Sequence, residues 1–86
     1  MNFDIYKFTC FLNNRVLIIG ANGQLGRIFI NALLERGDFV LASDINTPKP
    51  ISLGCEFIYL DALNQRKIKK AVLKYNISQI YNFAAV

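Results

Sequence analysis

The sequence contains no histidine, and it has only two cysteines among its 86 residues. The absence of histidine excludes a histidine-based catalytic triad or zinc site within this chain. Cys10 and Cys55 show neither the spacing of metal ligands nor a redox motif. We therefore expect both thiols to be reduced and the location to be cytoplasmic.

Long hydrophobic runs and a strong excess of one charge are also missing. No apolar run reaches the length of a transmembrane helix, and Asp4 and Lys7 interrupt the aromatic N-terminus in a way that is not typical of a signal peptide. The net charge is +4, and the basic cluster within 66–70 is more typical of the solvated face of a helix than of a nucleic-acid patch. We expect neither a membrane nor a nucleic acid as a partner.

The length limits the chain to one small domain. A chain this short buries a smaller share of its surface than a larger domain, yet 53% of its residues are hydrophobic. This composition suggests part of a larger core. Residues 1–14 carry apolar side chains without a regular period, and we assign this N-terminal extension no role. The informative patterns lie within 15–86.

Three glycines separate an apolar run from a helical pattern. Val16–Ile19 has the composition of a buried parallel strand. Gly20, Gly23 and Gly26 follow, and apolar residues then recur at spacings of three and four over 24–36. The stripe expected to face the protein comprises Leu25, Ile28, Phe29, Ala32 and Leu33. The pattern predicts the first strand–turn–helix unit of a dinucleotide-binding fold.

Each glycine has a distinct expected role. Gly20 allows a tight turn out of the strand, Gly23 lets the backbone approach a pyrophosphate, and Gly26 lets the helix lie close to the strand. The phosphates would sit at the helix N-terminus, where backbone N–H groups and the helix dipole favour negative charge. The spacing is G-x-x-G-x-x-G rather than the general G-x-G-x-x-G. The alternative is a strand-to-helix turn without a ligand.

The rest of the chain alternates strands and helices. Further strands are predicted over 39–42, 57–60 and 79–83, and a second helix over 64–75. Its expected apolar stripe consists of Ile68, Ala71, Val72 and Tyr75. Gly37 and Asn76 suit helix ends, and two prolines within 46–50 predict a loop. These elements predict an α/β fold with a partial Rossmann-type parallel sheet of order 3-2-1-4 and helices on its faces.

Two aspartates end predicted strands. Asp44 stands eighteen residues after Gly26, close to the position of an acidic residue that binds ribose hydroxyls. A carboxylate there would repel a 2′-phosphate, which favours NAD over NADP. The alternative for Asp44 is an ordinary turn residue. For Asp61, a cap on the following segment and a contact with the adenine are equally open.

These residues together resemble the N-terminal part of the extended short-chain dehydrogenases/reductases, in the NAD-dependent epimerase/dehydratase family. The resemblance covers about 15–86 and is carried by the glycine motif, by Leu41–Ile45, by Tyr59–Asp61 and by Phe83–Ala85. Within the family it is similar to the short-chain type of L-threonine 3-dehydrogenases. It departs from them at Ile19, where many members have threonine, and at Asn82, where histidine is frequent.

The resemblance implies NAD as the cofactor. In the family the strand-end aspartate, here Asp61, meets the adenine, and the segment at 83–85 passes beside the nicotinamide side. Together with the glycine motif, it implies cofactor contacts at Gly20, Asn22, Gly23, Gln24, Leu25, Gly26, Asp44, Ile45, Leu60, Asp61, Ala84 and Ala85.

The family's catalytic Tyr-x-x-x-Lys pair, in which lysine lowers the pKa of the acid/base tyrosine, does not occur in the sequence. Tyr6, Tyr59, Tyr75 and Tyr81 are followed four residues on by Cys10, Leu63, Gln79 and Ala85. We expect no catalytic residue here, and we interpret 15–86 as the truncated N-terminal part of the NAD-binding domain of a dehydrogenase or epimerase.

A small-molecule substrate would then bind only in the full-length parent. The alternative is a non-catalytic nucleotide-binding module or a gene remnant. We also expect self-association through the uncovered edge of the fourth strand.

Overall fold

The computed structural model describes residues 14–46 and 55–84. The segment 1–13, the predicted loop beyond Asn46 and Ala85 lie outside the described residues. The elements are β1 (Arg15–Ile19), α2 (Gln24–Arg36), β2 (Phe39–Asp44), β3 (Glu56–Tyr59), α3 (Gln65–Lys74) and β4 (Gln79–Asn82). All strand pairs are parallel and the order is β3-β2-β1-β4, which confirms the predicted α/β fold and strand order.

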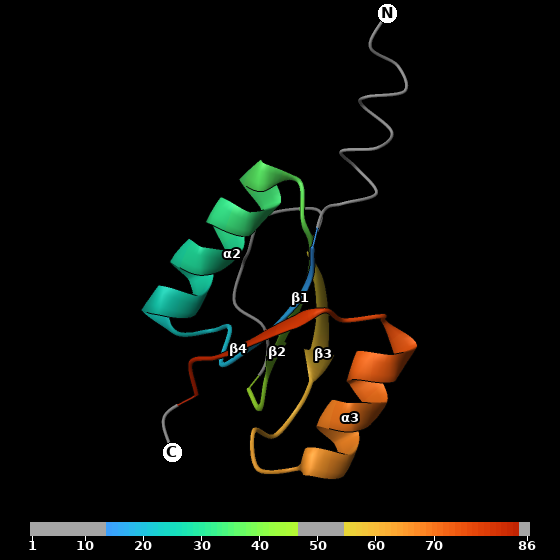
Figure 1. The fold of residues 1–86 in the computed structure, drawn as a ribbon. Helices are drawn as coiled ribbons and strands as arrows, with labels where there is room; N and C mark the ends of the chain where they lie inside the picture. Colours follow the sequence, from blue (N-terminus) through green and yellow to red (C-terminus); the bar gives the residue numbers. More distant parts are fainter. Residues whose placement is uncertain (1–13, 47–54, 85–86) are drawn as a thin grey trace, which may run out of the picture.

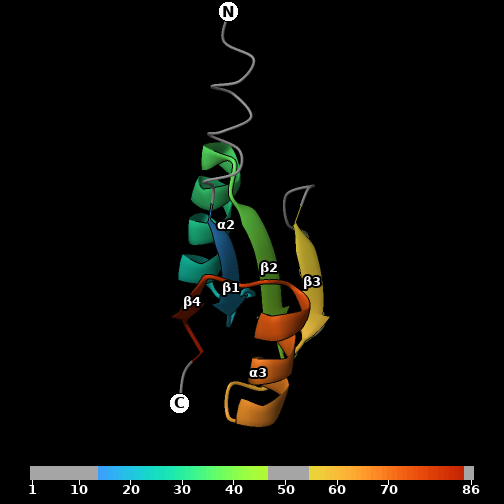
Figure 2. The same cartoon turned by 45° about the vertical axis from the view of Figure 1, so that its right-hand side comes forward.

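The two helices cover opposite faces of the sheet, as both views show (Figure 1, Figure 2). Val16 and Ile18 of β1 belong to the cluster on the α2 side, whereas Leu17 and Ile19 belong to the cluster on the α3 side. This alternation follows from the two-residue period of a strand. Because β1 is covered on both faces, its side chains from Val16 to Ile19 are apolar without interruption, as in other buried parallel strands.

The strand register brings the carboxyl ends of all four strands to one edge of the sheet. Ile19 at the end of β1 pairs with Ser43 of β2 and with Asn82 of β4. Asp44 of β2 pairs with Tyr59 of β3. The segments that follow the strands therefore meet at this edge, where open α/β sheets bind their ligands.

The helix ends use Gly37 and Asn76, which the sequence indicates, and Asn64, whose capping role the sequence analysis did not name. Gly37 has φ 93° and closes α2, with the Asp38 N–H donating to the Leu33 carbonyl at 3.0 Å. The Asn64 side chain caps α3 by accepting from the Lys67 N–H at 3.1 Å. Asn76, just beyond α3, has φ 54°. Neither described helix is long and apolar enough to cross a membrane.

The predicted inward stripe of α2 is wrong in part. Leu25 and Ile28 are 68% and 60% exposed, and Ala32 is also exposed. The buried residues of α2 are Gly26, Ile30 and Leu33. The apolar positions of this helix allow two stripes, rotated against each other. The stripe that contains Gly26 faces the sheet because a residue without a side chain permits the closest approach to the preceding turn.

Candidate nucleotide-binding site

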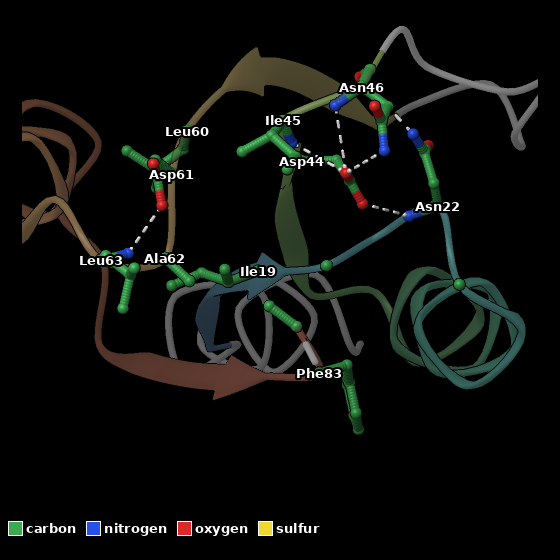
Figure 3. A pocket seen from close by; sticks show the side chains of 13 residues that line it. Ile19, Asn22, Asp44, Ile45, Asn46, Leu60, Asp61, Ala62, Leu63 and Phe83 are labelled. Carbon is green, nitrogen blue, oxygen red and sulfur yellow. Dashed lines mark hydrogen bonds between the residues drawn. The ribbon is translucent and has the colours of Figure 1, made fainter. Parts of the chain in front are cut away.

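A pocket of about 720 Å³ opens at the carboxyl ends of the strands (Figure 3). It is lined by Ile19, Gly20, Asn22, Gly23, Asp44, Ile45, Asn46, Leu60, Asp61, Ala62, Leu63, Phe83 and Ala84. These residues come from the segments that follow all four strands. The pocket includes the ends of β1 and β4, the neighbouring strands at which the strand order reverses. Ligands bind at this point in such sheets.

Gly20 turns the chain sharply at the end of β1. Its φ is +83°, a left-handed conformation that glycine adopts without a steric penalty. A Cβ at this position would lie 2.6 Å from the Ala84 nitrogen. Two hydrogen bonds hold the turn against β2, because the N–H groups of Gly20 and Ala21 both donate to the Ser43 carbonyl at 2.9 Å. The conformation and the close contact therefore both require glycine at position 20.

Gly26 and Gly23 differ in what surrounds them. A Cβ at Gly26 would lie 2.7 Å from the Gly20 carbonyl oxygen, so the packing of α2 against the turn requires the glycine. A Cβ at Gly23 would meet only the Gly20 oxygen, at an ordinary 3.6 Å, and the φ of Gly23 is −70°. The fold itself therefore tolerates a side chain at Gly23, and the space in front of it is open.

Gly23 also begins α2. The helix has no side-chain cap and no acidic residue in its first turn. The first N–H groups of a helix lack intrahelical acceptors, and they carry the positive end of the helix dipole. This end of α2 is therefore suited to an anion placed over Gly23.

Asp44 is held in one orientation at the end of β2. One carboxylate oxygen, Oδ2, accepts from the Asn22 N–H at 3.0 Å. The other, Oδ1, accepts from the N–H groups of Ile45 at 2.8 Å and Asn46 at 3.2 Å. The side chain is mostly buried and points into the pocket beside the glycine turn (Figure 3). These bonds join the end of β2 to the glycine turn.

Asp61 occupies the corresponding position after β3. Its Oδ1 accepts from the Leu63 N–H at 2.9 Å, and its backbone oxygen accepts from the Asn64 N–H at 2.9 Å. The capping contact considered for Asp61 is therefore present. The residue is also exposed and lines the pocket, so the same carboxylate remains accessible to a ligand.

The structure brings most, but not all, of the sequence-predicted residues together. Gln24 and Leu25 are exposed on α2 and Gly26 is buried beneath the turn, so these three do not line the pocket. The lining residues that the sequence reasoning missed are Ile19, Asn46, Ala62 and Leu63, whereas Phe83 belongs to the segment at 83–85 that was expected beside the cofactor. The strand order could have indicated them, because each lies at or just beyond a strand end on the same edge.

Comparison with known proteins identifies the class. The model of the NAD dependent epimerase/dehydratase family matches residues 16–86, and the chain belongs to this family.

Among individual proteins, the chain is 34% identical over 88 residues to the inactive L-threonine 3-dehydrogenase, mitochondrial, of Homo sapiens, with 99% of this chain and 38% of that protein covered. The holo form of the GalE-like L-threonine dehydrogenase from Cupriavidus necator superposes with a TM-score of 0.74 and 32% identity, covering 84% of this chain and 24% of that one. A short-chain dehydrogenase from Leptospira borgpetersenii with bound NAD+ gives a TM-score of 0.71 and 26% identity, covering 86% and 32%. The chain thus spans between about a quarter and two fifths of these relatives.

Proposed function

We propose that residues 15–86 form the N-terminal part of an NAD-binding Rossmann domain, and that the pocket binds the adenosine and pyrophosphate half of NAD. The observation that carries the proposal is the open space at Gly23, next to the oriented carboxylate of Asp44. The fold does not require glycine at position 23, whereas a pyrophosphate lying against the backbone does. The NAD named for the Leptospira relative supports the choice of ligand.

Each part of the cofactor has a candidate position in the pocket. The pyrophosphate would lie over Gly23 at the N-terminus of α2. The ribose hydroxyls would donate to Asp44, whose Oδ2 can accept a second hydrogen bond besides that from Asn22. The adenine would lie among Ile45, Leu60 and Asp61. Ala84 and Ala85 would face the nicotinamide side, and Gln24, Leu25 and Gly26 would contribute through the backbone of the first helical turn.

Cofactor choice tests this assignment. Because the Asp44 carboxylate would repel a 2′-phosphate, NAD should bind more tightly than NADP in calorimetric titrations. Asp44→Ala should weaken NAD binding and narrow the difference between the two cofactors. A matched control is Asp61→Ala, which removes an exposed carboxylate from the same pocket and should keep the preference for NAD. Equal or tighter binding of NADP by the unchanged chain would contradict the role of Asp44.

We further propose that the parent protein is an NAD-dependent dehydrogenase or epimerase, in which the nicotinamide accepts or donates a hydride. A small-molecule substrate would bind only in this full-length parent protein. No tyrosine of this chain has a lysine four residues on, so the 86-residue chain alone should lack dehydrogenase activity. Replacing the matching quarter of the Cupriavidus enzyme by residues 15–86 tests this division: the chimera should oxidise L-threonine with NAD, and the isolated chain should not.

A non-catalytic NAD-binding module is the second candidate, and the name of the human relative, an inactive L-threonine 3-dehydrogenase, supports it. The chimera distinguishes the two. A chimera that binds NAD without turnover would favour the module, whereas turnover would favour the enzyme.

We retain a cytoplasmic location as a proposal. The sequence has only two cysteines and no redox motif, which is typical of a reducing compartment. The name of the human relative includes a mitochondrial location, so imaging of a fluorescent fusion with a mitochondrial marker is the decisive measurement.

A further inference from the structure

The outward face of α3 gathers five cations around one exposed leucine. The inward side chains of this helix, Ile68, Ala71, Val72 and Tyr75, pack on the sheet cluster. The opposite half of the helix carries Arg66, Lys67, Lys69, Lys70 and Lys74, all exposed. Leu73 lies among them and is 70% exposed. Both views place α3 on the outside of the sheet (Figure 1, Figure 2).

These cations have no acidic neighbours on their own helix. The sequence contains no aspartate or glutamate after Asp61. Among the described residues, an ion pair joins Arg36, the last residue of α2, to Asp38 just beyond that helix. Arg66–Lys70 and Lys70–Lys74 are like charges at i,i+4, an arrangement that destabilises a helix. Lys74 has one favourable contact, because it lies in the last turn of α3 with its Nζ 5.4 Å from the Tyr75 ring centroid. The remaining cations form a surface of like charges.

We propose that the outward face of α3 is a docking surface for an acidic protein segment, whose carboxylates pair with these cations while an apolar side chain covers Leu73. The face complements such a segment in charge and in its single apolar contact. The nearest aromatic ring, that of Tyr75, is stacked on Phe39. It is therefore not available to stack on a nucleic-acid base. The face is also convex and only ten residues long, which limits its contact with a flat bilayer.

The test uses the 86-residue chain and a fluorescently labelled synthetic peptide in which glutamates recur at helical spacing around leucines. Anisotropy should show binding at low salt that weakens as salt screens exposed charges. The double variant Lys70→Gln/Lys74→Gln should bind about two- to thirty-fold more weakly, the range for two exposed ion pairs. Adding Leu73→Ala to this double variant should weaken peptide binding further.

The matched control is Lys7→Gln/Lys49→Gln, which removes the same charge outside α3 and should bind the peptide as the unchanged chain does. Circular dichroism confirms that each variant is folded. Three results would overturn the proposal: absence of peptide binding at low salt, equal weakening in both double variants, or tighter α3-dependent binding of a DNA duplex or of vesicles containing phosphatidylserine.

Discussion

At the scale of single residues, the three glycines of the turn have three different reasons for lacking a side chain. Position 20 requires glycine for its left-handed backbone conformation, and position 26 requires it because the helix packs closely against the turn. Neither reason applies to Gly23. The sequence pattern indicated all three positions, because their spacing after an apolar strand is informative. Which glycine is required by the fold depends on distances between backbone atoms, and these are absent from a pattern of letters.

Gly23→Val should abolish NAD binding while leaving most of the fold intact. The branched side chain would fill the space that the pyrophosphate needs, and its Cβ would make only an ordinary contact of 3.6 Å with the Gly20 oxygen. Calorimetric titration and circular dichroism measure the two effects. The control is Gly26→Val, which should unfold or strongly destabilise the chain because a Cβ there would lie 2.7 Å from a backbone oxygen. An unchanged affinity of folded Gly23→Val for NAD would place the phosphate site elsewhere.

Cys55 should react slowly with alkylating reagents at neutral pH. Burial, followed by the nearby Glu56 charge, raises the pKa of its thiol, although a backbone hydrogen bond from Ala42 opposes the shift. The rate of iodoacetamide labelling against pH, measured in a Cys10→Ser background, should give a higher pKa in the folded chain than in denaturant. Because the folded pKa is raised, the associated stability is present below the unfolded pKa and is lost as the pH rises through the folded pKa. Equal pKa values in both states would contradict this prediction.

At the scale of elements, the positions of the helices and strands were predicted more accurately than the orientation of their faces. The second helix has a single apolar stripe, so its orientation followed directly from the sequence. In α2, two apolar stripes compete, and Gly26 decides between them through a packing distance. In the site, Asp44 was predictable from its spacing, whereas Ser43, which holds the glycine turn through its carbonyl, carries no motif.

Asn64→Ala should destabilise the chain by about 1 kcal/mol, the typical effect of losing an N-cap side chain. The Asn64 oxygen accepts from the Lys67 N–H, and alanine would leave that donor without its cap. Urea unfolding followed by circular dichroism provides the measurement. Gln65→Ala, one residue further on and outside the cap contact, should change stability far less. Equal effects of the two substitutions would show that the cap contributes little.

At the scale of the whole molecule, strand alternation and right-handed crossovers were sufficient to predict the topology. This topology places β3 and β4 at the two edges of the described sheet. Ile80 and Tyr81 of β4 are 46% and 36% exposed. Unpaired backbone groups beside apolar side chains favour pairing between chains.

The isolated 86-residue chain should therefore associate or remain loosely packed. Sedimentation velocity should detect species larger than the monomer, and amide exchange should show weak protection in β4. Ile80→Lys, which places a charge on this edge strand, should reduce association. Leu63→Lys, which places the same charge outside the sheet, should not. A compact and well-protected monomer at micromolar concentration would contradict the prediction.

The bonds around Asp44 also bear on how cofactor preference changes in evolution. Its carboxylate accepts from the backbone N–H groups of Asn22, Ile45 and Asn46. A substitution to arginine, which would favour a 2′-phosphate, would remove the acceptor of all three donors. The N–H of Asn22 is the buried one of the three, and a buried unsatisfied donor costs about 1–3 kcal/mol. Under the role proposed for Asp44, a preference for NAD would be tied to the shape of the glycine turn. A lineage that shifts to NADP must remodel the turn and the end of β2 in concert.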